Sequence, residues 1–278
     1  MRIPNLENEQ RKFVKNMGPF RILEYLQDES VNPYNAEQAY FMAKMGVHRR
    51  QLVCYLNGKN GIRTQSGAMQ WTAGGVRAET GIKGAGDFLG KMVKGSVTGE
   101  SAVKPEYTGV GLLVLEPTYK YLILQDVASW GGGLVVEDGM FLASESTVQM
   151  SVVSRKSVSS ALAGNEGLFN MCFTGSGVVA LESNVPEGEL IEIELKDDEL
   201  KIDGHMAVAW SASLAFTVER SSKTLLGSAM TGDGLVNVFR GTGKVLMAPV
   251  TESGSLVAAT ASAAPAAGKA AIKLPFGG

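Results

Sequence analysis

The sequence predicts an all-β, barrel-like protein in which one supersecondary unit is built three times around a shared core. An aromatic residue, one further residue, Gly-x-Gly and a mostly apolar run occur together at residues 107–117, 173–183 and 239–249. These copies start at a constant interval of 66 positions. A fixed period of this length is typical of repeated units that bury their apolar faces against one another. Strand-like pairs and recurring glycines around each copy predict the same class, with pseudo-threefold symmetry.

Residues 1–19 are predicted to form a helical extension before the β domain. The helical signal covers residues 6–17 and stops at Gly18-Pro19, because glycine supplies a left-handed cap and proline cannot continue a helix. Residues 20–26 alternate well enough to predict a strand.

Residues 36–45 are ambiguous. Their residue types favour a helix that ends at Gly46, whereas their position before residues 51–56 suits a strand that enters the first repeat. We expect a strand.

Residues 20–250 form the triplicated β domain, with repeats near residues 51–117, 120–183 and 190–249. Each repeat is expected to open with a hairpin, because two apolar runs flank a cluster of turn-forming residues. The paired runs are residues 51–56 with 62–69, 121–127 with 134–140, and 190–195 with 199–206.

Glycines recur at the same places in each repeat. Gly67, Gly139 and Gly204 close the second run of each hairpin, where glycine most often marks a bulge, a bend or a close backbone approach. A bulge repeated at one place would curve the sheets. The Gly-x-Gly motifs add Gly109 with Gly111, Gly175 with Gly177, and Gly241 with Gly243.

An acidic residue also recurs before a small residue in one loop of each repeat, as Glu100, Glu166 and Asp233. The three carboxylates could converge on a cation or a partner. Alternatively, each accepts hydrogen bonds from loop amides that would otherwise lack partners. We favour the second interpretation, because internal repetition multiplies any structural device.

The first repeat is longer than the others, with an insertion within residues 81–91. Its glycines lack the spacing of a phosphate-binding loop, since positions 85 and 92 are Ala and Met. Apolar residues at helical spacing among lysines suit an anionic membrane surface or a partner's groove, although packing on the barrel is the favoured alternative. The candidate interface residues are Phe88, Leu89, Lys91, Met92, Val93 and Lys94.

Composition narrows the function classes. The 278 residues carry a net charge of −2, which removes the general electrostatic attraction behind non-specific nucleic-acid binding. Cys54 and Cys172 have no metal-type spacing, and the N-terminus lacks a secretory signal, so we expect a cytoplasmic protein with reduced, buried thiols. His48 and His205 are the only histidines: we expect the first to be exposed in its basic run and the second to serve packing.

The residue composition of two further segments predicts their structure. Residues 185–203 are rich in acids that alternate with apolar residues, which predicts a strand with one solvated face rather than a calcium loop. Residues 251–278 are rich in Ala, Ser, Gly and Pro without a periodic apolar face, and we expect a disordered tail that does not span a membrane.

Four segments together resemble a known family. They are SGAMQW at residues 66–71, GDFLGKMVKGSVTGES at 86–101, AGNEGLF at 163–169 and GTGKVLMAP at 241–249. This ordered set is similar to the altered inheritance of mitochondria protein 24 family, in its bacterial branch, over roughly residues 20–250. The resemblance implies a double-stranded β-helix with threefold repetition, like the fold of the trp RNA-binding attenuation protein. Mitochondrial members are linked to inner-membrane organisation and respiratory assembly, and the family offers no catalytic residues to carry over.

Two function classes follow. The first, which we favour, is a non-catalytic scaffold or interaction protein acting in assemblies, including at a membrane surface or as a homo-oligomer. The second is a small-ligand- or metal-binding barrel, or an enzyme, because such barrels often hold ligands in their mouths. No catalytic residue, metal ligand, cofactor or nucleic-acid partner is expected.

Overall fold

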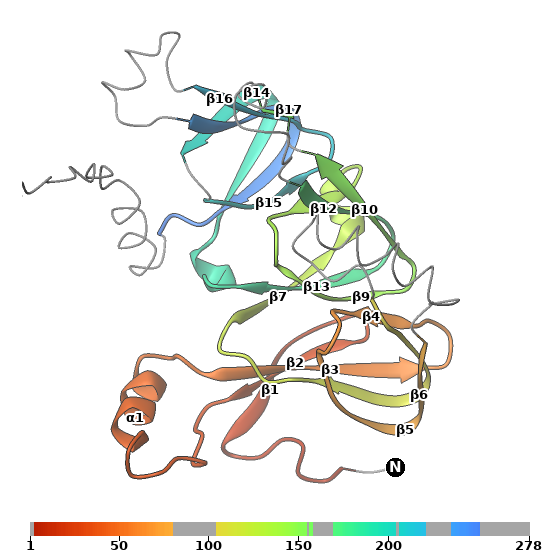
Figure 1. Ribbon diagram of the computed structural model, residues 1–278, viewed down its shortest axis with the longest axis vertical. Coiled ribbons are helices and arrows are strands. Elements are labelled where there is room, and N and C mark those ends of the chain that lie inside the picture. Colours follow the sequence, from red (N-terminus) through yellow and green to blue (C-terminus); the bar gives the residue numbers. More distant parts are fainter. Residues whose placement is uncertain are drawn as a thin grey trace, which may run out of the picture.

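The computed structural model describes residues 3–79, 104–154, 156–157, 169–203, 206–220 and 235–250. Strands are the dominant secondary structure of these residues, beside one α-helix and two short 3-10 helices, which confirms the all-β prediction. The strands form two curled sheets that follow one another along the longest axis (Figure 1). Pairing is antiparallel throughout the described strands except between β11 and β16.

The chain contributes three modules in sequence order. The first module, residues 11–115, lies at the lower end of Figure 1 and includes the described α-helix. Its elements are β1 (Arg11–Met17), β2 (Phe20–Tyr25), α1 (Ala36–Lys44), β3 (Arg49–Asn57), β4 (Ile62–Thr64), β5 (Met69–Glu79) and β6 (Glu106–Leu115).

The second module, residues 121–183, lies in the middle, and the third, residues 191–247, at the upper end. The second consists of β7 (Tyr121–Asp126), β8 (Leu134–Val136), β9 (Phe141–Glu145), β10 (Val148–Ser154), β11 (Lys156–Ser157), β12 (Phe169–Gly175) and β13 (Val178–Ser183). The third consists of β14 (Ile191–Asp203), β15 (Ala207–Ser211), β16 (Ala215–Arg220) and β17 (Leu235–Met247).

Both sheets cross module boundaries. The first sheet has the order β1-β2-β3-β6-β4-β9-β13-β7, with β5 paired to β6. The second has the order β10-β12-β8-β15-β17-β16-β11, with β14 paired to β17. The second module therefore donates strands to both sheets, which ties the three modules into one body.

Each module buries its own apolar cluster and lends residues to its neighbour. The first cluster combines Leu52 and Leu113 of the first module with Ala143 and Ala180 of the second. The next combines second-module residues with Ala209 and Leu246 of the third. Shared burial of this kind makes each module stabilise the next.

The three Gly-x-Gly segments share their pairing register. Their aromatic residues pair across the sheet with equivalent apolar residues: Tyr107 with Ile62, Phe173 with Leu134, and Phe239 with Leu200. A register shift of one residue also recurs, between Met69 and Trp71, between Phe141 and Ala143, and between Ala207 and Ala209. The first two irregularities lie two to four residues beyond Gly67 and Gly139, and the two glycines themselves lie in turns, with φ of 78° and 74°. A pseudo-threefold axis stays a prediction.

Two local predictions were wrong. Residues 11–17 form strand β1 rather than a helix, because Gly18-Pro19 is the two-residue turn of a hairpin in which Met17 pairs with Phe20. Gly18 has a φ of 53°, so the residue interpreted as a helix cap makes a hairpin turn instead. Residues 36–44 form helix α1 rather than a strand, in agreement with their Ala-, Glu- and Met-rich composition.

The predicted hairpins were also wrong in their partners. β3 and β4 both pair with β6, and β7 and β8 lie in different sheets. The acidic run is one strand, β14, with a bulge at Lys196 and Asp197, where Asp197 has a φ of 56°. Alternation identifies a strand and its buried face, but it does not identify the neighbour. The predicted tail, residues 251–278, lies outside the described residues.

Candidate functional site

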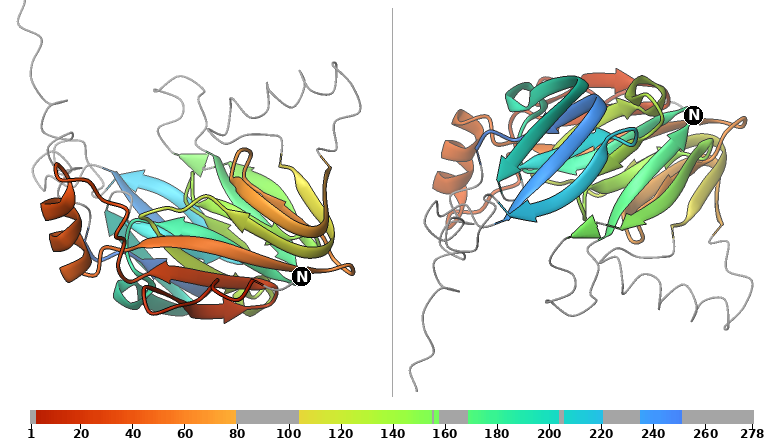
Figure 2. Two further views of the ribbon diagram at one scale, coloured as in Figure 1. Left: turned by 90° about the horizontal axis from the view of Figure 1, so that it is seen from below. Right: turned by 90° about the horizontal axis from the view of Figure 1, so that it is seen from above.

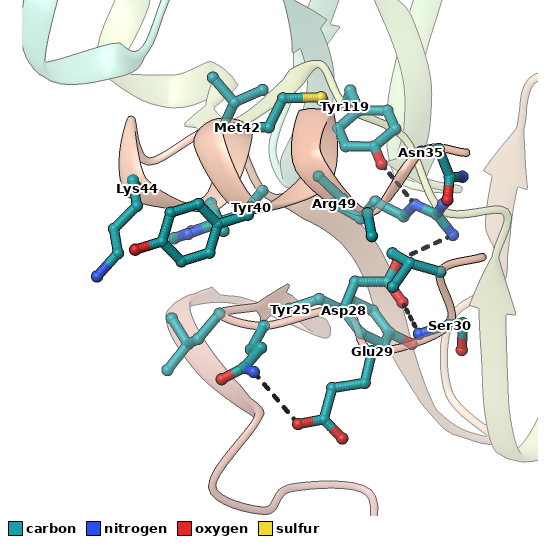
Figure 3. Close-up of a pocket in the computed structure, with 18 residues that line it drawn as sticks. Tyr25, Asp28, Glu29, Ser30, Asn35, Tyr40, Met42, Lys44, Arg49 and Tyr119 are labelled. Atoms are coloured by element: carbon teal, nitrogen blue, oxygen red, sulfur yellow. Dashed lines mark hydrogen bonds and ion pairs between the residues drawn. The ribbon is translucent and has the colours of Figure 1, made fainter. Parts of the chain in front are cut away.

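A pocket of about 490 Å³ lies between helix α1, the segment that follows β2, and the start of β3 (Figure 3). Figure 2 shows α1 standing beside the strands rather than over a sheet face. The helix forms because a run of strong helix formers follows the turn at Asn32–Asn35, where the Asn35 amide donates to the Asn32 carbonyl at 3.1 Å. The pocket is lined by Tyr25, Leu26, Gln27, Asp28, Glu29, Ser30, Val31, Asn35, Ala36, Ala39, Tyr40, Met42, Ala43, Lys44, Val47, His48, Arg49 and Tyr119.

A carboxylate behind the pocket wall holds two basic side chains. Glu24 on β2 has its Oε1 2.6 Å from His48 Nδ1, and its Oε2 accepts from Arg50 Nε at 2.9 Å. Arg50 is buried and its guanidinium lies 4.2 Å from the centre of the Tyr121 ring, so it also anchors the second module. The expectation that this basic run is exposed was wrong, because the β2–β3 pairing places Glu24 directly opposite Arg50.

A second ionic group lines the pocket. Arg49 donates from Nε to the Tyr119 hydroxyl at 3.0 Å, and its Nη1 lies 3.2 Å from Asp28 Oδ2. The hydrogen bond to Tyr119 raises the pKa of Arg49, so the guanidinium stays charged. Figure 3 shows both interactions as dashed lines along one side of the pocket.

Tyr25 supplies a hydroxyl to the same pocket. Its hydroxyl donates to Oε1 of Gln51, and burial raises the pKa of Tyr25. The phenol therefore remains neutral at physiological pH. The pocket thus combines a fixed cation, carboxylates and aromatic rings, which suits binding of a polar organic molecule.

The described part of the chain contains no group of three or more His, Cys, Asp or Glu side chains that could hold a metal ion. Of the two histidines, His48 is committed to Glu24, and His205 lies outside the described residues. Cys54 and Cys172 are buried free thiols, as predicted.

Helix α1 presents an aromatic surface next to the pocket. None of its nine residues is buried. Tyr40 and Phe41 are 57% and 58% exposed, and their rings contact each other edge to face at 5.5 Å between centroids. Tyr34 and Met45 extend this surface at the two ends of the helix. We call Tyr34, Tyr40, Phe41 and Met45 the α1 aromatic face.

The structure places the recurring glycines in the scaffold rather than in this pocket. Gly67 and Gly139 come together, on the wall of a shallow pocket between the first two modules. The Gly-x-Gly glycines lie within or between β6, β12, β13 and β17. Gly204, the loop acids Glu100, Glu166 and Asp233, and the candidate interface residues 88–94 lie outside the described residues.

Sequence reasoning missed both the pocket and the α1 aromatic face. The available signal was the helix propensity of residues 36–45, which would have predicted a short helix with aromatic residues around it. No pattern in the sequence indicated that this helix would lie beside Arg49 and Tyr119, which are 70 positions apart.

Two curled, barrel-like antiparallel sheets with shared module cores define a protein of the all-β class. The family model described as Mitochondrial biogenesis AIM24 matches residues 45–250, and the chain belongs to this family. This confirms the resemblance seen in the sequence.

One relative agrees with this assignment, and one solved structure shares the fold. An uncharacterised protein of Streptococcus pyogenes serotype M6 is 31% identical over 192 residues, which is 66% of this chain and 75% of that protein. A crystal structure of a Streptococcus pyogenes protein superposes with a TM-score of 0.57 at 23% identity, covering 87% of this chain and 98% of that one. The second likeness shows the fold. Among the described helices, none is long and apolar enough to cross a membrane.

Proposed function

We propose that this protein is a non-catalytic interaction protein that docks a partner protein on the α1 aromatic face. The observation that carries the proposal is the exposure of Tyr40 and Phe41 on a helix that buries none of its residues. Exposed aromatic and Met side chains are the types enriched at the centres of protein interfaces.

The surroundings of the face support recognition of an apolar segment bordered by polar residues. Lys44 lies 5.4 Å above the Tyr40 ring, while Glu37 and the acidic segment at Asp28 and Glu29 flank the helix. An aromatic centre with charges around it has the layout of an apolar core with a polar rim. Because the helix contributes no buried side chain, substitutions on its outer face are expected to leave the fold intact.

The test is capture of partners from the native host by full-length protein and by the Tyr40→Ser/Phe41→Ser double variant. A partner identified by mass spectrometry should cross-link to α1 in the parent chain and be lost from the double variant. The matched control is Val152→Ser, which removes an apolar side chain of similar exposure on β10. Loss of binding with Val152→Ser, or equal capture by the double variant, would refute docking on the α1 aromatic face.

The second candidate function is binding of a small polar ligand in the pocket beneath α1. Its supporting observation is a pocket volume within the range of ligand sites, with Arg49 held in the pocket lining by Asp28 and Tyr119. Native mass spectrometry of protein purified from its host should then show a retained small mass, lost in Arg49→Gln. A ligand-free mass in the purified host protein would remove this candidate.

A further inference from the structure

The two junctions between modules are built in one register. At the first, β4 pairs with β9 so that Ile62 faces Glu145 and Thr64 faces Ala143. At the second, β8 pairs with β15 so that Leu134 faces Ser211 and Val136 faces Ala209. At both junctions the first strand, β4 or β8, also pairs with the Gly-x-Gly aromatic residue of its own module. The second strand, β9 or β15, contains the bulge of the next module.

Each end of the described chain has only one of the two strands that form such a junction. In the third module, the corresponding strand is residues 199–203 of β14, where Leu200 faces Phe239, and among the described strands β14 pairs with β17 alone. In the first module, the corresponding strand is the start of β5, which pairs with β6 alone among them. Figure 1 places β14 at the upper end and β5 at the lower end of the longest axis.

Burial follows the presence of a neighbouring strand. Ala143 and Ser144 of β9 are fully buried, whereas the corresponding Trp71 is half-buried and Thr72 is exposed. At the other end, Leu200 of β14 is partly buried, whereas the corresponding Leu134 and Ile62 of the internal junctions are 0% and 1% exposed. The terminal modules therefore lack the cover that the internal junctions provide.

We propose that copies of this chain associate head to tail, with the β14 edge of one copy pairing antiparallel with the β5 edge of the next. The register of the internal junctions places Leu200 opposite Ala73, Lys201 opposite Thr72, and Ile202 opposite Trp71. An open strand edge presents unpaired backbone groups that a second chain can satisfy. The contact is heterologous, so it extends into longer chains or closes into a ring.

Strand type favours this pairing over a symmetric one. Each internal junction joins a strand that pairs with a Gly-x-Gly aromatic residue (β4 or β8) to a strand that contains a bulge (β9 or β15). Neither junction joins two equivalent strands. In a symmetric pairing of β14 centred on Lys201, that lysine would face the same lysine of its own copy. Like charges directly opposite destabilise a strand pair, and the head-to-tail register contains none.

The N-terminal segment limits the strength of the contact. Three residues of the N-terminal part, Leu6, Phe13 and Tyr25, pack on the face formed by Val53 and Val114. In the second and third modules, the corresponding face packs against the preceding module. The second copy therefore docks chiefly through the strand edge, which buries less area than an internal junction. We expect association that depends on concentration.

The test is sedimentation velocity of the full chain over a hundredfold concentration range. The weight-average mass should rise well above the 29.4 kDa of one chain. Thr72→Lys places a lysine opposite Lys201 and should return the mass to that of the monomer, while Thr72→Ser should not. Adding Lys201→Glu to Thr72→Lys should restore association, which would show that a lysine at position 72 is compatible with the fold.

A parent chain that stays monomeric throughout the range would overturn the proposal. Association that is unaffected by Thr72→Lys would also overturn it and would indicate a symmetric contact or another surface. The inference is independent of the proposed function, since docking on α1 and pairing at the strand edges use different residues and are lost in different variants.

Discussion

Gly109 on β6 packs directly against the backbone of Gly75 on β5: a Cβ atom added to Gly109 would lie 2.0 Å from the Gly75 carbonyl oxygen. Gly109 also has a φ of 107°, which side chains rarely adopt. Gly109→Ala should therefore lower the free energy of unfolding by more than about 1 kcal/mol, measured by urea denaturation. The matched control is Gly188→Ala, where no atom lies within 4 Å of the added Cβ. Equal stability of the two variants would show that the β5–β6 pair can relax.

Gly175 is the corresponding glycine of the second module, and its surroundings are less tightly packed than those of Gly109. Its φ is 90°, and an added Cβ would lie 3.2 Å from the Thr147 carbonyl oxygen. Gly175→Val should destabilise by about 1 kcal/mol or more, because a β-branched residue is strained at positive φ. An unchanged melting temperature would mean that the loop before β10 moves to accept the side chain.

Removal of the Glu24 carboxylate should leave Arg50 buried without its ionic partner. Glu24→Ala is expected to cost about 1–3 kcal/mol of unfolding free energy, the usual penalty for an unsatisfied buried polar group. Glu24→Gln retains an acceptor and should cost less. The control Glu29→Ala removes an exposed carboxylate from the neighbouring loop. If Glu24→Ala matches this control, Arg50 finds another acceptor or water.

The Glu219–Arg240 pair between β16 and β17 should make stability depend on acid pH. Hydrogen bonds from Arg240, at 2.5 and 3.0 Å, hold the pKa of Glu219 at about 2. Since the folded pKa lies below the unfolded value of about 4.3, the stabilisation is complete above that value and is lost as the pH falls toward 2. The stability difference between the parent chain and Glu219→Gln should be small, as is usual for exposed pairs, and should shrink between pH 5 and pH 2. A difference that grows on acidification would contradict this assignment.

Both cysteines should resist modification in the folded protein. Burial raises the pKa of Cys54, and burial also raises the pKa of Cys172, so neither forms appreciable thiolate near neutral pH. Iodoacetamide at pH 8 should label neither thiol of the native chain and both in urea, as read by intact mass. Rapid labelling of native Cys54 would show local opening of β3.

The repeated strands of the fold could be predicted from residue types alone. The 66-residue interval of Tyr107, Phe173 and Phe239 predicted three equivalent strands, and their partners Ile62, Leu134 and Leu200 lie in one shared register. The recurring Gly67 and Gly139 lie in turns just before the bulges. These signals are local, because a strand's alternation and a glycine's freedom are properties of a few consecutive residues.

The sequence by itself therefore determined the all-β class, the repeated strands and their buried faces. Tertiary structure decided which strands became neighbours, as when β7 and β8 separated into different sheets and Gly18-Pro19 closed a hairpin instead of ending a helix. It also decided the site, by bringing Arg49 to Tyr119 and Glu24 to His48 and Arg50. The physical reason is that strand pairing and ion pairing depend on which distant groups reach each other in space, and a backbone edge carries the same donors and acceptors whatever its side chains are.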